Sequence, residues 1–325
     1  MKRRALLGTM TVGLVAPMLC GKVFAQSPND VKLVIPFPAG GGGDVLGRSP
    51  LDALSKNLGK DIWVLNRPGA GGNIGTAYLI DEPQKDASFG YVTNGIMCVN
   101  RYLYDNMKFD PLTDLEPVGQ ISKVGLVMVL NPKALPGVTD YQSLVKYSKA
   151  HPGEVFFASS GVGTTSHLAG QFFAMQTGLN LTHVPHAGGA AAMVEVLAGR
   201  IPFMIDVAAN ALPHVKNGSL KAIAVTTAER LENLPDTPTM KEIGLKDYEL
   251  CAWDGYVVPK GAPKELKDKL SQALVKCRSD QKVIERIKKL GAQPVLSTGA
   301  EFAEFIKEEA PKWKALAQSI SKMNS

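Results

Sequence analysis

Cysteine is scarce in this sequence of 325 residues, which contains four. One lies in an N-terminal segment that we expect to be removed, and Cys98, Cys251 and Cys277 remain. An odd number of cysteines, with none at the spacing of a metal site, argues against a disulfide-stapled framework and against a zinc centre. One disulfide stays open as an alternative, because the sequence alone does not select the pair.

Long apolar runs are missing beyond the N-terminus. Residues 1–4 are mostly basic, residues 5–19 are mostly apolar, and a small-residue cleavage site ends at Ala25. These are the regions of a signal peptide, so we expect residues 1–25 to be removed, by the general or the twin-arginine export route. No later run approaches the roughly 20 apolar residues of a transmembrane helix. The sequence therefore predicts an exported protein of the periplasm.

A strong net charge is also missing once the expected leader is set aside. The whole chain has 36 basic and 30 acidic residues, or +6, but four of the bases and none of the acids lie in residues 1–25. The remaining chain therefore has 32 bases against 30 acids, or +2. This balance gives no reason to expect a nucleic acid or a membrane surface as a partner.

Glycine, in contrast, is concentrated where predicted strands end. Residues 31–37 form a short β-rich apolar run, residues 38–43 form a loop with few side chains, and Asp44 stands where the N-cap of the next helix is expected. Backbone N–H groups at the start of a helix favour anions, and glycine lets a ligand approach the backbone closely. This stretch predicts a carboxylate or phosphate site, with a flexible loop as the alternative.

Two later segments repeat the order of strand, small polar loop and helix. One follows a strand predicted over residues 154–159, and the other follows a strand predicted over residues 181–185. Their candidate ligand residues are Ser160, Thr164, Thr165 and His167 in the first segment and His186, Ala187 and Gly188 in the second. Asn94-Gly95, at the end of a further predicted strand, is another candidate for the same cleft.

No pattern in the sequence supports catalysis or a nucleotide cofactor. Ser160 and His167 do not form the G-x-S-x-G arrangement of a hydrolase, and His167 falls in the following helix, where a core or capping role is the alternative. The glycines from Gly69 to Gly75 are spaced one residue too widely for a dinucleotide fingerprint. We therefore expect no catalytic residue, no cofactor and no metal ion.

Asp206 and Trp253 each have two interpretations. Asp206 follows a predicted strand, where α/β proteins place ligand groups, but it could equally cap the next helix. Trp253 could stack on a ligand or fill the core between domains.

Strands and helices alternate along the chain in two blocks, and two long β-like segments, residues 118–130 and 248–258, can cross between the blocks. This pattern predicts an α/β fold with two doubly wound domains around a hinged ligand cleft. Domain 1 would comprise residues 26–125 and 253–325, and domain 2 residues 126–252. A helix is expected over residues 45–58, kinked or delayed by Pro50, and a loop and a helix are expected within residues 235–245.

From residue 31 to its end the chain resembles the Bug-type substrate-binding proteins of tripartite tricarboxylate transporters. The matching segments are PFPAGGGGD (36–44), NRPGAGGNIG (66–75), SSGVGTTSHLAG (159–170), HVPHAGGAAAM (183–193) and a long run that begins at residue 206. The resemblance implies a type II periplasmic binding protein fold. It also implies capture of a small organic acid and its delivery to the large and small membrane subunits of a transporter, by a protein that we expect to be a monomer.

The resemblance also implies which residues bind the ligand. Two loops would grip one carboxylate, largely through backbone groups, and they comprise Phe37, Pro38, Ala39, Gly40 and Gly41 with Asp44, and His186, Ala187 and Gly188. Ser160, Thr164, Thr165, His167 and Asp206 match positions that line the cleft in the family.

His186 departs from the tyrosine that is usual in the family, and Ala187 replaces a lysine or serine-like residue. The ligand could therefore be a dicarboxylate, a tricarboxylate, an acidic amino acid or, with Met97, His186 and Trp253 nearby, an aromatic diacid of the phthalate type. A sensory binding protein with the same pocket, or an exported enzyme that acts on a carboxylate, are the alternative functions.

Overall fold

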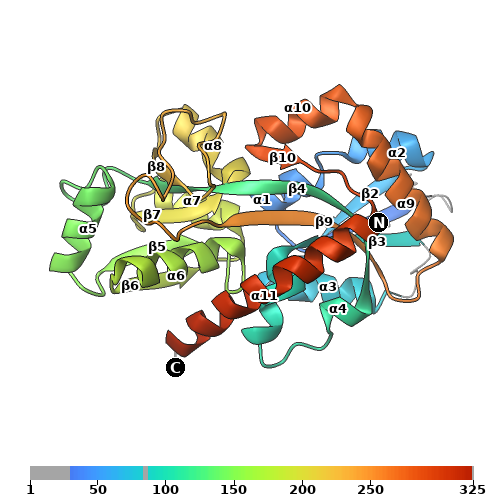
Figure 1. Cartoon of the computed structure of the whole chain (residues 1–325), viewed down its shortest axis with the longest axis horizontal. Helices are drawn as coiled ribbons and strands as arrows, with labels where there is room; N and C mark the ends of the chain where they lie inside the picture. The colour runs from blue at the N-terminus through green and yellow to red at the C-terminus, as the bar shows by residue number, and fades with distance from the viewer. Residues whose placement is uncertain (1–29, 83–86, 324–325) are drawn as a thin grey trace, which may run out of the picture.

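Two long antiparallel strands, β4 (Leu115–Leu130) and β9 (Cys251–Pro259), run through the middle of the computed structural model and join its two halves (Figure 1). The structure describes residues 30–82 and 87–323, so the predicted signal peptide lies outside the described residues. β4 pairs with β9 up to Gly125, and from Leu126 it pairs with β7 (Phe203–Val207) and β8 (Lys221–Val225). β4 therefore crosses from one half to the other, as the sequence predicted.

The first half is built on three parallel strands in the order β2-β1-β3, next to β9. These strands are β1 (Val31–Ile35), β2 (Ile62–Asn66) and β3 (Ser88–Thr93), and every residue of β1 is buried. The remaining elements of this half are α1 (Gly42–Gly47), α2 (Leu51–Leu58), η1 (Ala70–Gly72), α3 (Asn73–Ile80), η3 (Gly95–Val99), η4 (Asn100–Tyr102), α4 (Pro111–Asp114), α9 (Lys264–Lys276), η5 (Cys277–Ser279), α10 (Gln281–Lys289) and β10 (Ala292–Pro294).

The second half is built around β5 (Val155–Ser159), which lies between β7 and β6 (Leu181–Pro185) and runs parallel to both. Its helices are α5 (Tyr141–Ala150), α6 (Thr165–Thr177), α7 (Gly189–Leu197) and α8 (Ala208–Lys216). The last helix, α11 (Gly299–Met323), begins beside the first half, packs on β4 and reaches α6 of the second half (Figure 1). Helix α11 thus contacts both halves.

Alternating strands and helices in both halves confirm the predicted α/β class. In the described part of the chain the strands form one ten-stranded sheet, because β4 pairs in both halves; eight strands follow one path, and β8 and β10 pair with β4 beside it. The sheet is mixed, whereas alternation alone predicted parallel sheets, since β4 and β9 run antiparallel to their neighbours as they cross. The domain boundaries expected from the sequence stay a prediction.

Three local expectations differ from the structure. Pro50 does not kink one long helix but separates α1 from α2, because a proline cannot continue the helical hydrogen bonds. The segment from residue 235 to 245 forms turns instead of a helix. Cys98, Cys251 and Cys277 are free thiols, so the alternative of a single disulfide does not hold.

None of the helices in the described part of the chain combines the length and the apolar character that crossing a bilayer requires.

Candidate ligand-binding site

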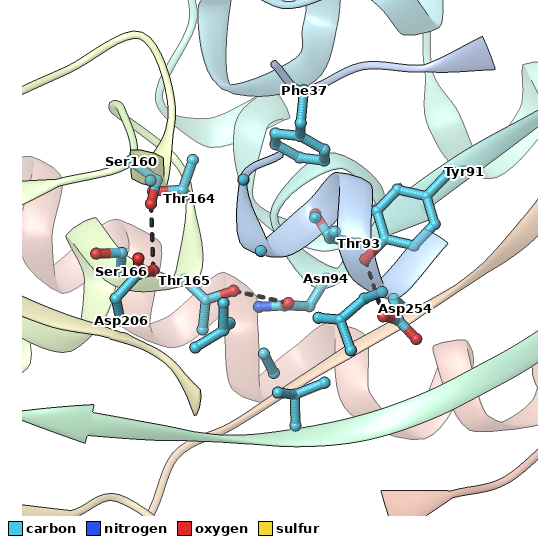
Figure 2. Close-up of a pocket in the computed structure, with 18 of the residues that line it drawn as sticks. Phe37, Tyr91, Thr93, Asn94, Ser160, Thr164, Thr165, Ser166, Asp206 and Asp254 are labelled. Atoms are coloured by element: carbon cyan, nitrogen blue, oxygen red, sulfur yellow. Dashed lines mark hydrogen bonds between the residues drawn. The ribbon is translucent and has the colours of Figure 1, made fainter. Parts of the chain in front are cut away.

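A cavity of about 60 Å³ lies where the two halves meet, beside the crossing strands (Figure 2). This volume leaves room for roughly four to six water-sized groups. The first half supplies the loop after β1, the start of α1 and the end of β3, and the second half supplies the loop after β5, the start of α7 and the end of β7. The polar side chains on the wall are Tyr91, Thr93, Asn94, Ser160, Thr164, Thr165, Ser166, Asp206 and Asp254.

The wall of the first half is mostly backbone. Gly42 and Gly43 line the cavity at the start of α1, and a Cβ on Gly42 would lie 2.5 Å from a methyl group of Val207 in the other half. Glycine is therefore required there by the close approach of the two halves. A ligand in the cavity meets the N-terminal end of α1, where backbone N–H groups favour an anion.

Asp44 does not lie where the sequence placed it. The helix begins at Gly42, because glycines continue the helical turn without a side-chain cap, so Asp44 falls inside the first turn. Its carboxylate accepts hydrogen bonds from the backbone N–H of Gly40 at 2.9 Å, from Arg48 at 2.7 Å and from Asn66 at 2.8 Å. Asp44 is buried outside the cavity wall, and it positions the glycine loop.

The wall of the second half is a hydroxyl-rich turn that leads into α6. Thr164 is the N-cap of this helix and accepts a hydrogen bond from the backbone N–H of His167 at 3.4 Å. The Ser166 hydroxyl donates to the carbonyl of Ile205 at 2.7 Å, which ties the start of α6 to β7. These bonds fix the start of α6, where Thr164 and Thr165 line the cavity together with Ser160.

Two buried carboxylates stand on the wall. Asp206 accepts hydrogen bonds from Ser160 at 3.2 Å and from Asn210 at 2.7 Å. Asp254, on β9, accepts from the Tyr91 hydroxyl at 2.8 Å and from the hydroxyl and backbone N–H of Ser122 at 2.9 Å. Burial raises the pKa of each carboxyl to about 6, although these hydrogen bonds favour the ionised form.

A second cavity, of about 250 Å³, adjoins the first and shares Phe37, Pro38 and Ser160 with it. The loop after β6 lines this second cavity through His186, Ala187 and Gly188, opposite η1 and the preceding glycine turn. The two loops expected to grip a carboxylate therefore meet at the boundary between the cavities. Ala39 and Gly40 are exposed and line neither cavity.

The two halves touch around the cavities. The Thr165 hydroxyl donates to the Asn94 side-chain oxygen at 2.8 Å, as Figure 2 shows. The Tyr104 hydroxyl donates to the carbonyl of Val162 at 2.9 Å. These bonds join the first half to the hydroxyl-rich turn of the second half, so the structure is a closed form.

His167 and His183 support the hydroxyl-rich turn from behind. His167 Nδ1 accepts a hydrogen bond from the backbone N–H of Gly163 at 3.3 Å, and its ring lies 4.3 Å from that of His183. His183 Nε2 lies 2.6 Å from the Ser159 hydroxyl. Burial lowers the pKa of His167 to about 4 and that of His183 to about 3, and both are therefore neutral at pH 7. His167 lines neither cavity, which matches the core alternative.

Trp253 fills the core between β9 and α11. Its ring makes edge contacts with Phe302 and Phe305, at centroid distances of 5.6 and 5.5 Å, and only 1% of the residue is exposed. The ring is therefore engaged by protein and is not free to stack on a ligand. Trp253 still borders the cavity, and its indole N–H has no hydrogen-bond partner among the described residues. Met97 is buried and borders neither cavity.

Sequence reasoning missed Tyr91, Thr93 and Asp254. Thr93 ends β3 and could have been predicted as a site residue, because ligand groups gather where parallel strands end. Asp254 is an acid inside the apolar run of β9, and an acid in that setting is a signal that we could have used.

The cavity is chemically suited to hold a small polar molecule. Of the described residues, no lysine, arginine or histidine lines the 60 Å³ cavity, so any anion there is held by N–H and hydroxyl groups. Within residues 30–82 and 87–323, no group of three or more His, Cys, Asp or Glu side chains could hold a metal ion.

Comparisons with known proteins agree with this picture. The model of the tripartite tricarboxylate transporter family receptor matches residues 46–322. Protein BugT of Bordetella pertussis (strain Tohama I) is 31% identical over 313 residues, which cover 95% of this chain and 93% of BugT. The structure of the periplasmic binding protein BugD has a TM-score of 0.85 at 32% identity and covers 91% of this chain and 99% of its own.

A further solved structure carries a ligand. Rpa4515 of R. palustris, described with adipate, has a TM-score of 0.85 at 30% identity and covers 90% of this chain and 97% of its own. These structural neighbours confirm the two-domain fold of periplasmic binding proteins. The chain belongs to the tripartite tricarboxylate transporter receptor family, as a Bug-type solute-binding protein, and that family consists of substrate-binding receptors rather than enzymes.

Proposed function

We propose that this protein is exported to the periplasm by its signal peptide, captures a small organic acid and delivers it to the large and small membrane subunits of a tripartite transporter. The observation that carries the proposal is the cavity enclosed between two halves, with the glycine-rich start of α1 on one side and a hydroxyl-rich turn on the other. The adipate described with Rpa4515 supports a dicarboxylate as the ligand class.

The proposed mechanism is closure of the two halves on one carboxylate. The carboxylate would lie at the boundary of the two cavities, between the loop that contains Phe37 and Pro38 and the loop that contains His186 and Gly188. Because the two loops belong to different halves, a carboxylate that contacts both stabilises the closed form over the open form. Ser160, which borders both cavities, would complete the grip.

The energies are sufficient for a transport receptor. A charge-assisted hydrogen bond contributes about 1.5–3 kcal/mol net. Three or four such bonds, offset by the cost of ordering the ligand and the loops, reach the roughly −8 kcal/mol of a micromolar complex. The part of the ligand that enters the 60 Å³ cavity then determines which acid is preferred.

A thermal-shift screen tests the proposal. The purified protein is heated with aliphatic and aromatic mono-, di- and tricarboxylates and with acidic amino acids, after mass spectrometry has shown that no ligand copurified. A ligand at a hundredfold excess over its dissociation constant stabilises the native state by about 2.7 kcal/mol. We expect a rise in melting temperature with one class of acid. A folded, empty protein that responds to none of them would contradict the proposal.

A further inference from the structure

The charged side chains on the wall of the 60 Å³ cavity are acidic. Asp206 comes from the second half and Asp254 from β9, and the exposed fractions of these residues are 2% and 1%. The one other titratable side chain on this wall is Tyr91, whose hydroxyl already donates to Asp254. Of the described residues, none on the wall carries a positive charge.

The charged groups behind the wall do not offset these carboxylates. Arg48 is paired with Asp44 at 2.7 Å, outside the cavity wall. His167 and His183 lie behind the turn after β5, where burial lowers the pKa of both. His186 borders only the larger cavity, and Lys123 lies on the opposite side of β4.

The wall also holds a hydrogen-bond donor that nothing in the described part of the chain uses. The Asn94 side-chain oxygen accepts from Thr165, but its Nδ2 group has no partner among the described residues, although Asn94 is fully buried. Figure 2 places the Asn94 amide among the wall residues, directed toward Thr165 of the other half. A buried donor without a partner costs about 1–3 kcal/mol, which a ligand acceptor would recover.

We propose that the ligand binds with a single negative charge: one carboxylate at the two glycine-containing loops and an uncharged acceptor, such as an amide or a protonated carboxyl, at Asn94. The inference rests on the proposed function and specifies the charge state of the ligand within that site. A monocarboxylate with an amide or carbonyl at its far end carries this single charge without any change. A dicarboxylate carries a single charge only if one proton is taken up on binding.

The physical reason is the cost of a further charge. Burial already raises the pKa of Asp206 and Asp254 to about 6, so the part of the wall around these two carboxyls disfavours negative charge, whereas the N–H groups that favour an anion lie at the start of α1. A second ligand carboxylate would place another negative charge beside these two with no cation to offset it. An uncharged acceptor takes the hydrogen bond of the unpartnered Asn94 Nδ2 group without this cost.

Matched pairs of ligands test the proposal on the unaltered protein. Succinate, glutarate and adipate are each compared with their half-amide by titration calorimetry at pH 6 and pH 8, in buffers with different ionisation enthalpies. The half-amide should bind at least about tenfold more tightly than the diacid at pH 8. Asp206 and Asp254 titrate near pH 6 with either ligand, so the half-amide serves as the reference for their effect. As the pH falls, the affinity of the diacid should rise up to about tenfold per pH unit relative to that of the half-amide, with uptake of one proton more than the half-amide takes up.

Two outcomes would overturn the inference. If a diacid binds equally well at pH 6 and pH 8, without proton uptake and more tightly than its half-amide, the site accepts a doubly charged ligand and the proposed function stands. If none of these ligands and no other carboxylate of the thermal-shift screen binds, the proposed function fails and this inference fails with it.

Two variants test the role of the Asn94 amide. Asn94→Leu removes Nδ2 together with the hydrogen bond from Thr165, whereas Thr165→Val removes the same hydrogen bond and leaves Nδ2 in place. The half-amide should lose at least about tenfold in affinity with Asn94→Leu and clearly less with Thr165→Val. Equal losses in the two variants would contradict a direct contact between the ligand and Nδ2. If either variant does not fold, the comparison of each diacid with its half-amide on the unaltered protein still decides the charge state of the bound ligand.

Discussion

A Cβ atom on Gly188 would lie 2.6 Å from Cγ of Pro38, closer than side chains can approach. Gly188 belongs to the loop after β6 in the second half, and Pro38 belongs to the loop after β1 in the first half. The two loops that we expect to grip a carboxylate therefore meet where the Pro38 ring packs against the backbone of Gly188. We expect closure of the two halves to depend on this contact, because a side chain at position 188 would collide with Pro38.

Replacement of Gly188 by alanine should weaken ligand binding by at least about tenfold, or about 1.4 kcal/mol. The added methyl group collides with Pro38 and opposes closure, and the backbone at φ +118° is strained for alanine. Gly218→Ala is the matched control, because Gly218 also has a positive φ of +75° but has open space around its Cβ position.

Titration calorimetry with an acid found in the screen measures the effect, and small-angle scattering measures closure. The Gly218→Ala protein should close on the ligand, and the Gly188→Ala protein should stay more extended at the same ligand concentration. Equal affinity in both variants would show that the Gly188–Pro38 contact is not part of the closed complex.

The hydrogen bond from Tyr104 to the carbonyl of Val162 joins the two halves in the closed form. Tyr104→Phe removes it and should weaken binding about fivefold, since such a bond contributes about 1 kcal/mol. Tyr141→Phe is a suitable control, because the Tyr141 ring packs on Phe173 away from both cavities.

Binding affinities of the two variants, measured in parallel, decide this prediction. If Tyr104→Phe binds as tightly as the unaltered protein, the two halves do not make this bond in the complex.

The Asp206 carboxyl should make stability depend on pH. Its pKa is raised by burial from 3.8 to about 6 in the folded protein, so the folded state holds the proton more tightly than the unfolded state. The resulting stabilisation is fully present below pH 3.8 and is lost as the pH rises through about 6. Two pKa units correspond to roughly 3 kcal/mol.

Asp206→Asn removes this titration. The stability of the unaltered protein relative to Asp206→Asn should therefore fall by up to about 3 kcal/mol between pH 4 and pH 7.5. Urea unfolding of both proteins at the two pH values measures the difference. Asp52→Asn is the control for loss of a carboxylate in general, because the Asp52 side chain is exposed. A difference that stays constant, or that grows with pH, would show that the folded protein does not raise this pKa.

Most of the fold was predictable from local sequence patterns. Strands followed by glycine or hydroxyl loops and then helices were predictable at β1, β5 and β6, because each unit is contiguous in the sequence. The crossing of β4 was predictable from the length of its apolar run. The antiparallel pairing of β9 with β3 and β4 was not, since it depends on segments more than 100 residues apart.

The site was predictable only in part, for the same reason. Ser160, Thr164 and Thr165 follow β5 directly, and the structure places them on the cavity wall with Asp206. Tyr91 and Asp254 reach the wall through pairing between distant strands, which the sequence pattern does not encode. Asp44 was misplaced because a glycine run can begin a helix without a side-chain cap, which a search for capping residues does not detect.

A crystal structure of the protein with the acid found in the screen tests the central claim most directly. We predict that one carboxylate of the acid accepts hydrogen bonds from both halves, from the loop that contains Phe37 and Pro38 and from the loop that contains His186 and Gly188. We also predict that its other end lies in the cavity beside Asn94. An acid bound to one half alone, or outside the two adjoining cavities, would contradict the account.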